Sequence, residues 1–408
     1  DTTTTVRDTV GGDHTSTHSE GESVLHISLQ RGLKDYKATA QASLEQEVRQ
    51  LVDKNVWKPM AMSELTLEEK KSMIRSSVFF KEKHDENNQF MKLKARLVAG
   101  GDQQCVDNIH DKSSPTVSTE NILMILAIAA IEGREVQSID IEGAYLEASI
   151  EGESVFMKLG KYVSDMIVSL YPKYAKFRCH DGCVVVKLLK ALYGCVQSSL
   201  LWYKKLKEVM LAMGYTMNPT DHCVFNKCIN GTQATVAVYV DDLLITHRDL
   251  SAMEDMVHDI KNQFTAIKRQ MQNPFKHLGM NITKLTNGDI VVDMMQYTKE
   301  CIKDWQVTGI SKTPATTSLF KVNDDDTKLH AVGVKEFHSS TAKLLYLSKR
   351  TRPDIELVVS HLCSRVNNPG VEDWDKLDRL FRYLSGTINY GVKFNAGGKV
   401  DMVIYVDA

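Results

Sequence analysis

Long apolar runs are absent from this 408-residue sequence, and their absence excludes a membrane-spanning helix. The longest run, Ile122 to Ile131, has ten residues. This is about half of what a bilayer requires and is typical of a buried helix. The first five residues are one Asp and four Thr, so the apolar centre of a signal peptide is missing as well. A glycine-rich phosphate loop of the nucleotide-hydrolase type and an internal repeat are also absent.

Cysteine is sparse, with 8 residues scattered along the chain. Without a leader peptide this usage predicts free thiols in a reducing, intracellular setting. A zinc site is the alternative for Cys179-His180-Asp181-Gly182-Cys183 with His222-Cys223 and Cys228. These spacings fit known zinc sites poorly, and Asp181-Gly182 is typical of a hairpin turn.

Charge gives little guidance, because the formal net charge is −2 at pH 7. A balance near zero argues neither for nor against nucleic acid, since positive charge can gather in one cleft. The hydrophobic content of 43% is enough for a large core and predicts two or three domains or subdomains.

The pattern along the chain predicts mixed helices and strands after a disordered tail. Residues 1–25 are dominated by Thr, Ser, Gly and His and cannot bury enough apolar surface to fold. The expected elements are a helix over 36–56, a hairpin from 78–80 and 90–99, a helix beginning at Ser118, strands over 136–141, 234–240 and 243–246, a helix over 251–264, and three helices within 337–384, with Pro353 in a first turn and Gly386 at a helix end.

The strongest local feature is Tyr239-Val240-Asp241-Asp242, which has apolar sequence on both sides. A strand, a tight turn and a second strand would place both carboxylates at the tip of a hairpin. Two such charges about 4 Å apart repel by roughly 4 kcal/mol at an effective dielectric constant of 20. A divalent cation, a basic partner or protonation must compensate them. A solvated turn stays open as the alternative, because Asp is a common turn residue.

A third acid, Asp140, favours the cation. It ends another apolar strand, about a hundred residues earlier in the chain. Two strands that end in acids can converge on a pair of Mg²⁺ ions, which is the usual apparatus of phosphoryl and nucleotidyl transfer.

These residues resemble the reverse transcriptases, and among them the copia class of LTR retrotransposons. Tyr239 to Asp242 is similar to the Tyr-x-Asp-Asp signature, and Asp140 to Tyr145 is similar to the motif of the first catalytic Asp. The resemblance covers 36–407 and continues in Lys94-Ala95-Arg96-Leu97-Val98-Ala99, Lys190-Ala191-Leu192-Tyr193-Gly194, Thr351-Arg352-Pro353-Asp354-Ile355 and Arg382-Tyr383-Leu384-Ser385-Gly386-Thr387.

The resemblance implies an α+β right-hand polymerase fold, with fingers, a palm with an antiparallel sheet, and a thumb, followed by a helical connection region. The implied division is a disordered tail (1–25), fingers and palm (26–300), a helical thumb and connection region (301–398), and the truncated start of a ribonuclease H domain (399–408), in which Asp407 matches the first metal ligand. Both ends of the chain are expected to be cut from a longer polyprotein.

The resemblance also implies roles for individual residues. Asp140, Asp241 and Asp242 match the catalytic triad, which binds two Mg²⁺ ions, with Mn²⁺ as an alternative. Tyr145 matches a steric gate against the ribose 2′-hydroxyl, with a core aromatic as the alternative. Lys94 and Arg96 share a strand face and match residues that close on the triphosphate; the alternative is a solvated strand face.

Other implied contacts lie in two short segments. Tyr193 and Gly194 match a loop that packs against the incoming nucleotide and the template, where Gly permits close approach of the backbone. Gln197 is a polar position of that loop, and Trp202 is expected to be a core anchor. Leu278 and Gly279 resemble a hairpin that contacts the primer; an ordinary bent strand is the alternative.

The implied function is RNA-directed DNA polymerase activity. Its partners would be an RNA template, a DNA or RNA primer, deoxynucleoside triphosphates and the remaining Pol and Gag parts, without a membrane. The family implies cytoplasmic virus-like particles. The chain departs from the family at Ser198-Ser199-Leu200-Leu201, where Pro and Arg are usual, and at Glu142, where Lys is common. The alternative is therefore a decayed relic that binds nucleic acid without catalysis; a structural protein that ignores nucleic acid is a weaker hypothesis.

Overall fold

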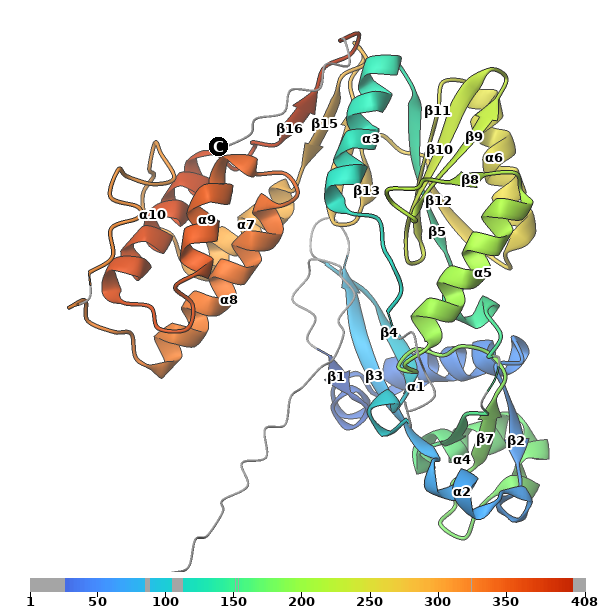
Figure 1. Cartoon of the computed structure of the whole chain (residues 1–408). Coiled ribbons are helices and arrows are strands. Elements are labelled where there is room, and N and C mark those ends of the chain that lie inside the picture. Colours follow the sequence, from blue (N-terminus) through green and yellow to red (C-terminus); the bar gives the residue numbers. More distant parts are fainter. Residues whose placement is uncertain are drawn as a thin grey trace, which may run out of the picture.

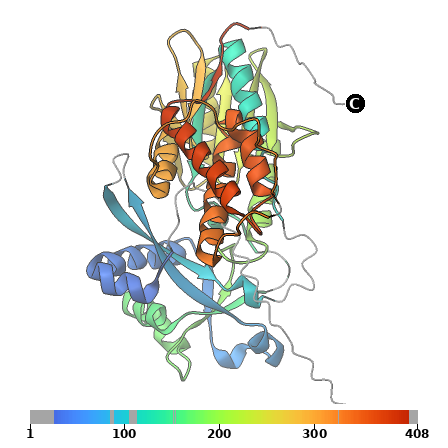
Figure 2. The ribbon, with the colours of Figure 1, turned by 90° about the vertical axis from the view of Figure 1, so that its left-hand side faces the viewer.

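The computed structural model describes residues 26–84, 89–104, 113–150, 152, 154–323 and 325–398. The tail (1–25) and the segment expected to start a ribonuclease H domain (399–408) lie outside the described residues. Figures 1 and 2 show three parts: an N-terminal part at the bottom of both views, a central sheet above it, and a C-terminal helical part beside the sheet. Within the described residues, no helix is long and apolar enough to cross a membrane.

The N-terminal part is a mixed sheet with helices packed on it. Its strands follow the order β1-β3-β6-β7-β2, with β4 paired to β3, and only β3 and β6 run parallel. The elements are β1 (Ile27–Ser28), α1 (Leu29–Asp53), β2 (Trp57–Met60), η1 (Met62–Glu64), α2 (Leu67–Lys71), β3 (Ile74–His84), β4 (Phe90–Ala99), η2 (Gly101–Gln103), β6 (Phe156–Lys158), α4 (Lys161–Leu170), η4 (Pro172–Phe177) and β7 (Val185–Leu188).

The predicted helix and hairpin of this part are confirmed. Helix α1 begins earlier than expected, because the hydroxyl of Ser28 caps an added first segment by accepting from the Arg31 amide. Lys37, with a φ of 42°, separates this segment from the part that corresponds to the predicted helix. Its buried positions Ala40, Leu44, Val48 and Leu51 recur at helical spacing and pack on the β3–β4 hairpin.

The central part is an antiparallel sheet in the order β12-β5-β11-β10-β9-β8. Figure 1 shows α3 on one side of this sheet and α5 and α6 on the other. The elements are α3 (Thr119–Glu132), β5 (Glu135–Ile141), η3 (Ala144–Glu147), α5 (Ser198–Ala212), β8 (Thr216–Met217), β9 (Val224–Ile229), β10 (Thr232–Tyr239), β11 (Asp242–His247), α6 (Leu250–Gln263) and β12 (Ile267–Gln270). The predicted strands and helices of this region are confirmed to within a few residues.

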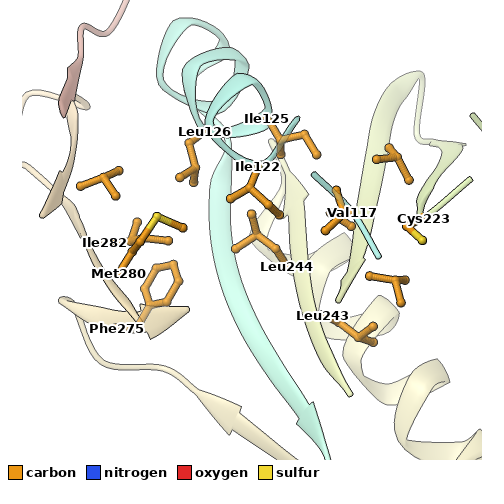
Figure 3. Close-up of a cluster of buried hydrophobic side chains, with 14 of the residues drawn as sticks. Val117, Ile122, Ile125, Leu126, Cys223, Leu243, Leu244, Phe275, Met280 and Ile282 are labelled. Carbon is orange, nitrogen blue, oxygen red and sulfur yellow. The ribbon is translucent and has the colours of Figure 1, made fainter. Parts of the chain in front are cut away.

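The central core forms around α3, the longest apolar run of the chain. Ser118 caps its first turn, as the sequence pattern predicts, and Gly133, in the left-handed conformation, ends it. Figure 3 shows Ile122 directed toward Leu244 of the central sheet and Leu126 directed toward Met280, which belongs to a second, four-stranded sheet of the C-terminal part. Helix α3 therefore joins the two sheets.

The C-terminal part consists of a small antiparallel sheet, β13-β14-β15-β16, and a group of helices. The three helices predicted within 337–384 are confirmed, and the expected boundary at residue 300 falls inside α7. The elements are β13 (Phe275–His277), β14 (Met280–Lys284), β15 (Ile290–Asp293), α7 (Met295–Trp305), α8 (Ala331–Ser348), η5 (Pro353–Ile355), α9 (Glu356–Cys363), α10 (Val371–Gly386) and β16 (Val392–Phe394).

Two of the sequence motifs of this part contact each other around the buried guanidinium of Arg352. That group donates to the Thr387 carbonyl (3.1 Å) and hydroxyl (2.8 Å) and to both carboxylate oxygens of Asp354 (2.9 and 2.8 Å). The Tyr383 hydroxyl donates to the same carboxylate at 2.8 Å. The motif before α9 thus holds the end of α10, and these residues serve the fold.

We predict that Arg352→Ala lowers the free energy of unfolding by about 3 kcal/mol or more, because it leaves Asp354 and Thr387 without their buried partner. Urea unfolding followed by circular dichroism would measure the loss. Arg382→Ala is the matched control, since it removes an exposed pair with Asp378 on the same helix and should cost about 0.5 kcal/mol or less. Equal losses in the two variants would contradict the prediction.

Candidate active site

The three acidic residues singled out by the sequence lie at one end of the interior strands of the central sheet. Strands β10 and β11 form a hairpin in which Tyr239 pairs with Asp242, so Val240 and Asp241 are its two-residue turn. On the other side of β11, Asp242 pairs with Asp140 of β5. Directly opposite residues of antiparallel strands point to the same face of the sheet. The structure therefore brings Asp140 and Asp242 together, with Asp241 adjacent in the turn.

The Val240–Asp241 turn has a strained backbone, and residues from other elements hold it in place. Val240 has a φ of 56°, a left-handed conformation that β-branched side chains rarely adopt. The indole Nε1 of Trp202 donates to the Val240 carbonyl at 2.6 Å, and the Ile141 amide donates to the Asp241 carbonyl at 2.9 Å. Trp202 is buried, as expected of a core anchor, and in addition fixes the conformation of the turn.

A cation accompanies the carboxylates on the same sheet. Lys268 of β12 pairs directly with Asp140, on the side opposite to Asp242. Adjacent like charges across strands are unfavourable, and a neighbouring ammonium group offsets part of that repulsion. Sequence reasoning missed Lys268, because its place opposite Asp140 depends on the register of β12.

Two tyrosines lie close to the turn and to each other. The rings of Tyr145, in η3, and Tyr193, in the loop before α5, have centroids 4.7 Å apart. Burial raises the pKa of Tyr145 to about 12, and the charge of Asp241 adds to the effect. Burial also raises the pKa of Tyr193, and Asp241 contributes there too. Both rings therefore lie within the electrostatic reach of Asp241.

The two basic residues of β4 share a face, as predicted. Leu93, Ala95 and Leu97 are buried, while Lys94 and Arg96 alternate with them on the other side. Lys94 keeps some contact with solvent, but the surrounding protein desolvates its ammonium group and so disfavours the charged form. The positive charges of Arg96 and Lys83 disfavour it further. Together they lower the pKa of Lys94 to about 8, although the charge of Asp140 acts in the opposite direction.

The second basic residue, Arg96, is held between two groups. Its guanidinium lies over the Tyr193 ring, 5.1 Å from the centroid, and its Nη1 lies 3.5 Å from the Glu47 carboxylate of α1. Arg96 therefore links helix α1 to the tyrosine pair beside the carboxylates. The sequence analysis also missed Glu47, although a charged residue at a core-facing position of a helix could have indicated a buried ionic partner.

The glycine of the loop serves a contact within the protein. The Tyr193 carbonyl accepts from the Ala99 amide at 2.8 Å, and Gly194 has a φ of 92°. A Cβ at Gly194 would collide with the Ala99 carbonyl oxygen, and a Cβ at Gly101 would collide with the carbonyl of Gly194. Gly194 thus permits a close approach to β4 and the turn that follows it, and the predicted approach to a nucleotide stays a prediction.

The unusual sequence after this loop is well accommodated. Gln197 accepts from the Gln104 side chain at 2.6 Å, so it holds the loop against the N-terminal part. The first residue of this segment, Ser198, has a buried hydroxyl that donates to the Leu192 carbonyl at 2.7 Å and accepts from the Leu192 amide at 3.1 Å. These bonds close the loop at the start of α5.

The expected primer hairpin is a two-residue turn between β13 and β14. Leu278 and Gly279 both have positive φ angles, 50° and 79°, which is the geometry of a type I′ turn. The turn is tied in two places. His277, just before it, contacts the Ser138 hydroxyl of β5 at 3.0 Å, and the Tyr346 hydroxyl of α8 donates to the Leu278 carbonyl at 3.3 Å.

The carboxylates have the chemistry that a hard divalent cation requires. Oxygen ligands from Asp suit Mg²⁺, and the half-buried Asp140 and Asp242 present theirs from paired positions. Among the residues that the structure describes, no group of three or more His, Cys, Asp or Glu side chains is gathered closely enough to hold a metal. The chemistry of the paired carboxylates therefore fits the ion, although three such side chains do not converge on one point among the described residues.

Parts of this chain are similar in sequence to known proteins. A family model described as "Reverse transcriptase (RNA-dependent DNA polymerase)" matches residues 62–319. The "Retrovirus-related Pol polyprotein from transposon RE1" of Arabidopsis thaliana is 26% identical over 337 residues, covering 81% of this chain and 21% of that protein. The corresponding polyprotein from transposon TNT 1-94 of Nicotiana tabacum is 27% identical over 319 residues, with coverages of 76% and 23%.

A solved structure of a foamy viral protease-reverse transcriptase in complex with double-stranded DNA aligns with 87% of this chain and 49% of its own, at 13% identity and a TM-score of 0.42. The chain spans about a fifth of the length of the two curated relatives. The family match covers more than half of the chain. The chain therefore belongs to the reverse transcriptase (RNA-dependent DNA polymerase) family and is a distant relative of the Pol polyproteins of copia-type retrotransposons.

Proposed function

We propose that this chain is an RNA-directed DNA polymerase that extends a primer on an RNA template. The observation that carries the proposal is the pairing of Asp140 with Asp242 across β5 and β11, with Asp241 in the adjoining turn. In the reaction, the primer 3′-oxygen bonds to the α-phosphorus of a deoxynucleoside triphosphate, and pyrophosphate leaves.

The carboxylates of Asp140, Asp241 and Asp242 would hold two Mg²⁺ ions, with Mn²⁺ as an alternative. Bound there, the ions would lower the pKa of the primer hydroxyl and neutralise charge on the triphosphate. The protein's own contribution is to fix these carboxylates in space. Trp202 and the β5–β11 ladder do this by fixing the backbone of the turn before substrate arrives.

The basic face of β4 would bind the triphosphate. Lys94 and Arg96 present ammonium and guanidinium groups on the side of the hairpin that faces Asp140 and the tyrosine pair. Arg96 suits a phosphate because its planar group donates two parallel hydrogen bonds. Tyr145 would lie beside the sugar and exclude a 2′-hydroxyl, in a position fixed by its contact with Tyr193.

The three parts of the fold would correspond to the parts of a right-hand polymerase. The N-terminal part would form the fingers, the central sheet the palm, and the helical part from Met295 onward the thumb and connection. The Leu278–Gly279 turn would contact the primer end, and its bond to Tyr346 would couple that contact to the helical part. The primer, the RNA template and other parts of the polyprotein would be its partners.

A relic that binds nucleic acid without catalysis is the second candidate. The observation in its favour is that the described acidic side chains do not gather three ligands around one point. The sequence at Ser199 and Leu200 lacks the Arg that is usual in the family. Such a relic would bind primer-template in a salt-sensitive manner without extending it.

We predict that Asp241→Asn abolishes primer extension, lowering the rate by at least about 10³-fold, while the melting temperature stays within a few degrees of the wild type. Extension of a labelled primer on RNA with Mg²⁺ would measure this. Asp255→Asn, on the exposed face of α6, is the control and should retain full activity. Wild-type extension by the Asp241 variant would sink the proposal; no extension by the wild type, with binding retained, would support the relic.

We also predict that the KM for the nucleotide rises about three- to tenfold between pH 7 and pH 9. Lys94 has its pKa lowered to about 8, so its ammonium is present below that pH and is lost above it. In Lys94→Arg the cation persists, and the KM should stay flat over the same range. Lys92→Arg, two residues away on the same face, is the control. If the KM of Lys94→Arg rises between pH 7 and pH 9 as much as the KM of the wild type, Lys94 does not bind the nucleotide.

A further inference from the structure

One buried carboxylate next to the site has no role in the chemistry described above. Glu47 is 7% exposed and lies on the core-facing side of α1, among Leu44, Val48 and Leu51. Charged side chains are rarely buried unless a specific partner compensates them. Burial raises the pKa of Glu47, and the partners that oppose the rise are Arg96, the Leu97 amide and Lys94. All three belong to β4.

The contacts of Glu47 divide between the backbone and one side chain of β4. Its Oε1 accepts from the Leu97 amide at 3.3 Å, which fixes the carboxylate against the strand. Its Oε2 lies 3.5 Å from Nη1 of Arg96. The same guanidinium lies over the ring of Tyr193 on the loop before α5. Arg96 is thus oriented from one side by a charge on α1 and from the other by an aromatic ring.

This arrangement uses only part of the hydrogen-bonding capacity of the guanidinium, whose side chain is 23% exposed. Arginine has five N–H donors, and only Nη1 approaches Glu47. Glu47 therefore holds the guanidinium through Nη1, and the other N–H groups can donate hydrogen bonds to an anion. An arginine held in this way loses less side-chain entropy when it binds a phosphate than one that moves freely in solvent.

We propose that Glu47 is a positioning residue that orients Arg96 for the triphosphate of the incoming nucleotide, an inference that rests on the proposed polymerase function. Helix α1 precedes residues 62–319, so Glu47 lies outside the segment matched by the family model. The N-terminal helix is accordingly part of the nucleotide-binding apparatus as well as a support for the β3–β4 hairpin.

The first test separates nucleotide binding from turnover. In primer extension with the full chain, Glu47→Gln should raise the KM for the nucleotide about tenfold and leave kcat within about twofold, as loss of a supporting contact to a binding group does. Glu45→Gln is the matched control, because Glu45 pairs with the exposed Arg49 on the same helix and should change neither constant. An unchanged or lowered KM in Glu47→Gln would overturn the proposal.

A double-variant cycle tests whether Glu47 acts through Arg96. If it does, adding Glu47→Gln to Arg96→Gln should raise the KM no further, whereas a merely structural carboxylate would add its own effect. Should Glu47→Gln melt at a much lower temperature than the wild type, Glu47→Met takes its place, since it fills the volume without a buried polar group. A further rise in the double variant would overturn the proposal.

A second measurement needs no catalysis, so it distinguishes this inference from the proposed function. Phenylglyoxal modifies accessible arginines, and mass spectrometry can follow Arg96 with Arg49 as the internal reference. Bound nucleotide, with primer-template present, should protect Arg96, and Glu47→Gln should raise the half-protecting concentration about tenfold. A chain that shows this shift without extending primers would refute the polymerase activity alone. Equal protection in both proteins, or protection in neither, would overturn the role of Glu47.

Discussion

The backbone ladder between β5 and β11 is the constraint on which the site depends. It sets Asp140 opposite Asp242, and the same register places Lys268 on the far side of Asp140. Side chains alternate along a strand, so a slip of one residue would turn Asp140 into the core and bring a buried isoleucine to the surface. The apolar residues on both faces of this sheet prevent such a slip, and in this way the hydrophobic core fixes the geometry of the charged site.

The sequence predicted the parts of this molecule that depend on short-range patterns. The strands around Asp140 and Asp241 and the helix capped by Ser118 follow from apolar spacing and capping residues, and the structure confirms them. The proximity of the acids could be predicted because both ended apolar strands. Their assignment as metal ligands came from the family resemblance and stays a prediction, as do the roles of Lys94, Arg96 and Tyr145.

Other features could not be predicted, because they arise where segments distant in sequence meet. Nothing near Lys268 in the chain indicates that it will face Asp140, since that depends on how the loop after α6 returns to the sheet. The need for glycine at 194 also comes from the backbone of β4, almost a hundred residues earlier, while the contact of this loop with a nucleotide stays a prediction. Arg352 belongs to a motif whose contacts serve the packing of helices.

The path of the chain through the small sheet has a further consequence. Helices α7 to α10 are contained between β15 and β16, which pair side by side, with Val292 opposite Val392. The whole helical part is therefore an insertion whose two ends leave from adjacent points of one sheet. Such a unit can rotate about its shared stem as a rigid body without stretching the chain on either side. Tyr346 belongs to this unit and its hydroxyl donates to the Leu278 carbonyl, so a rotation about the stem would change the position of the Leu278–Gly279 turn or break that hydrogen bond.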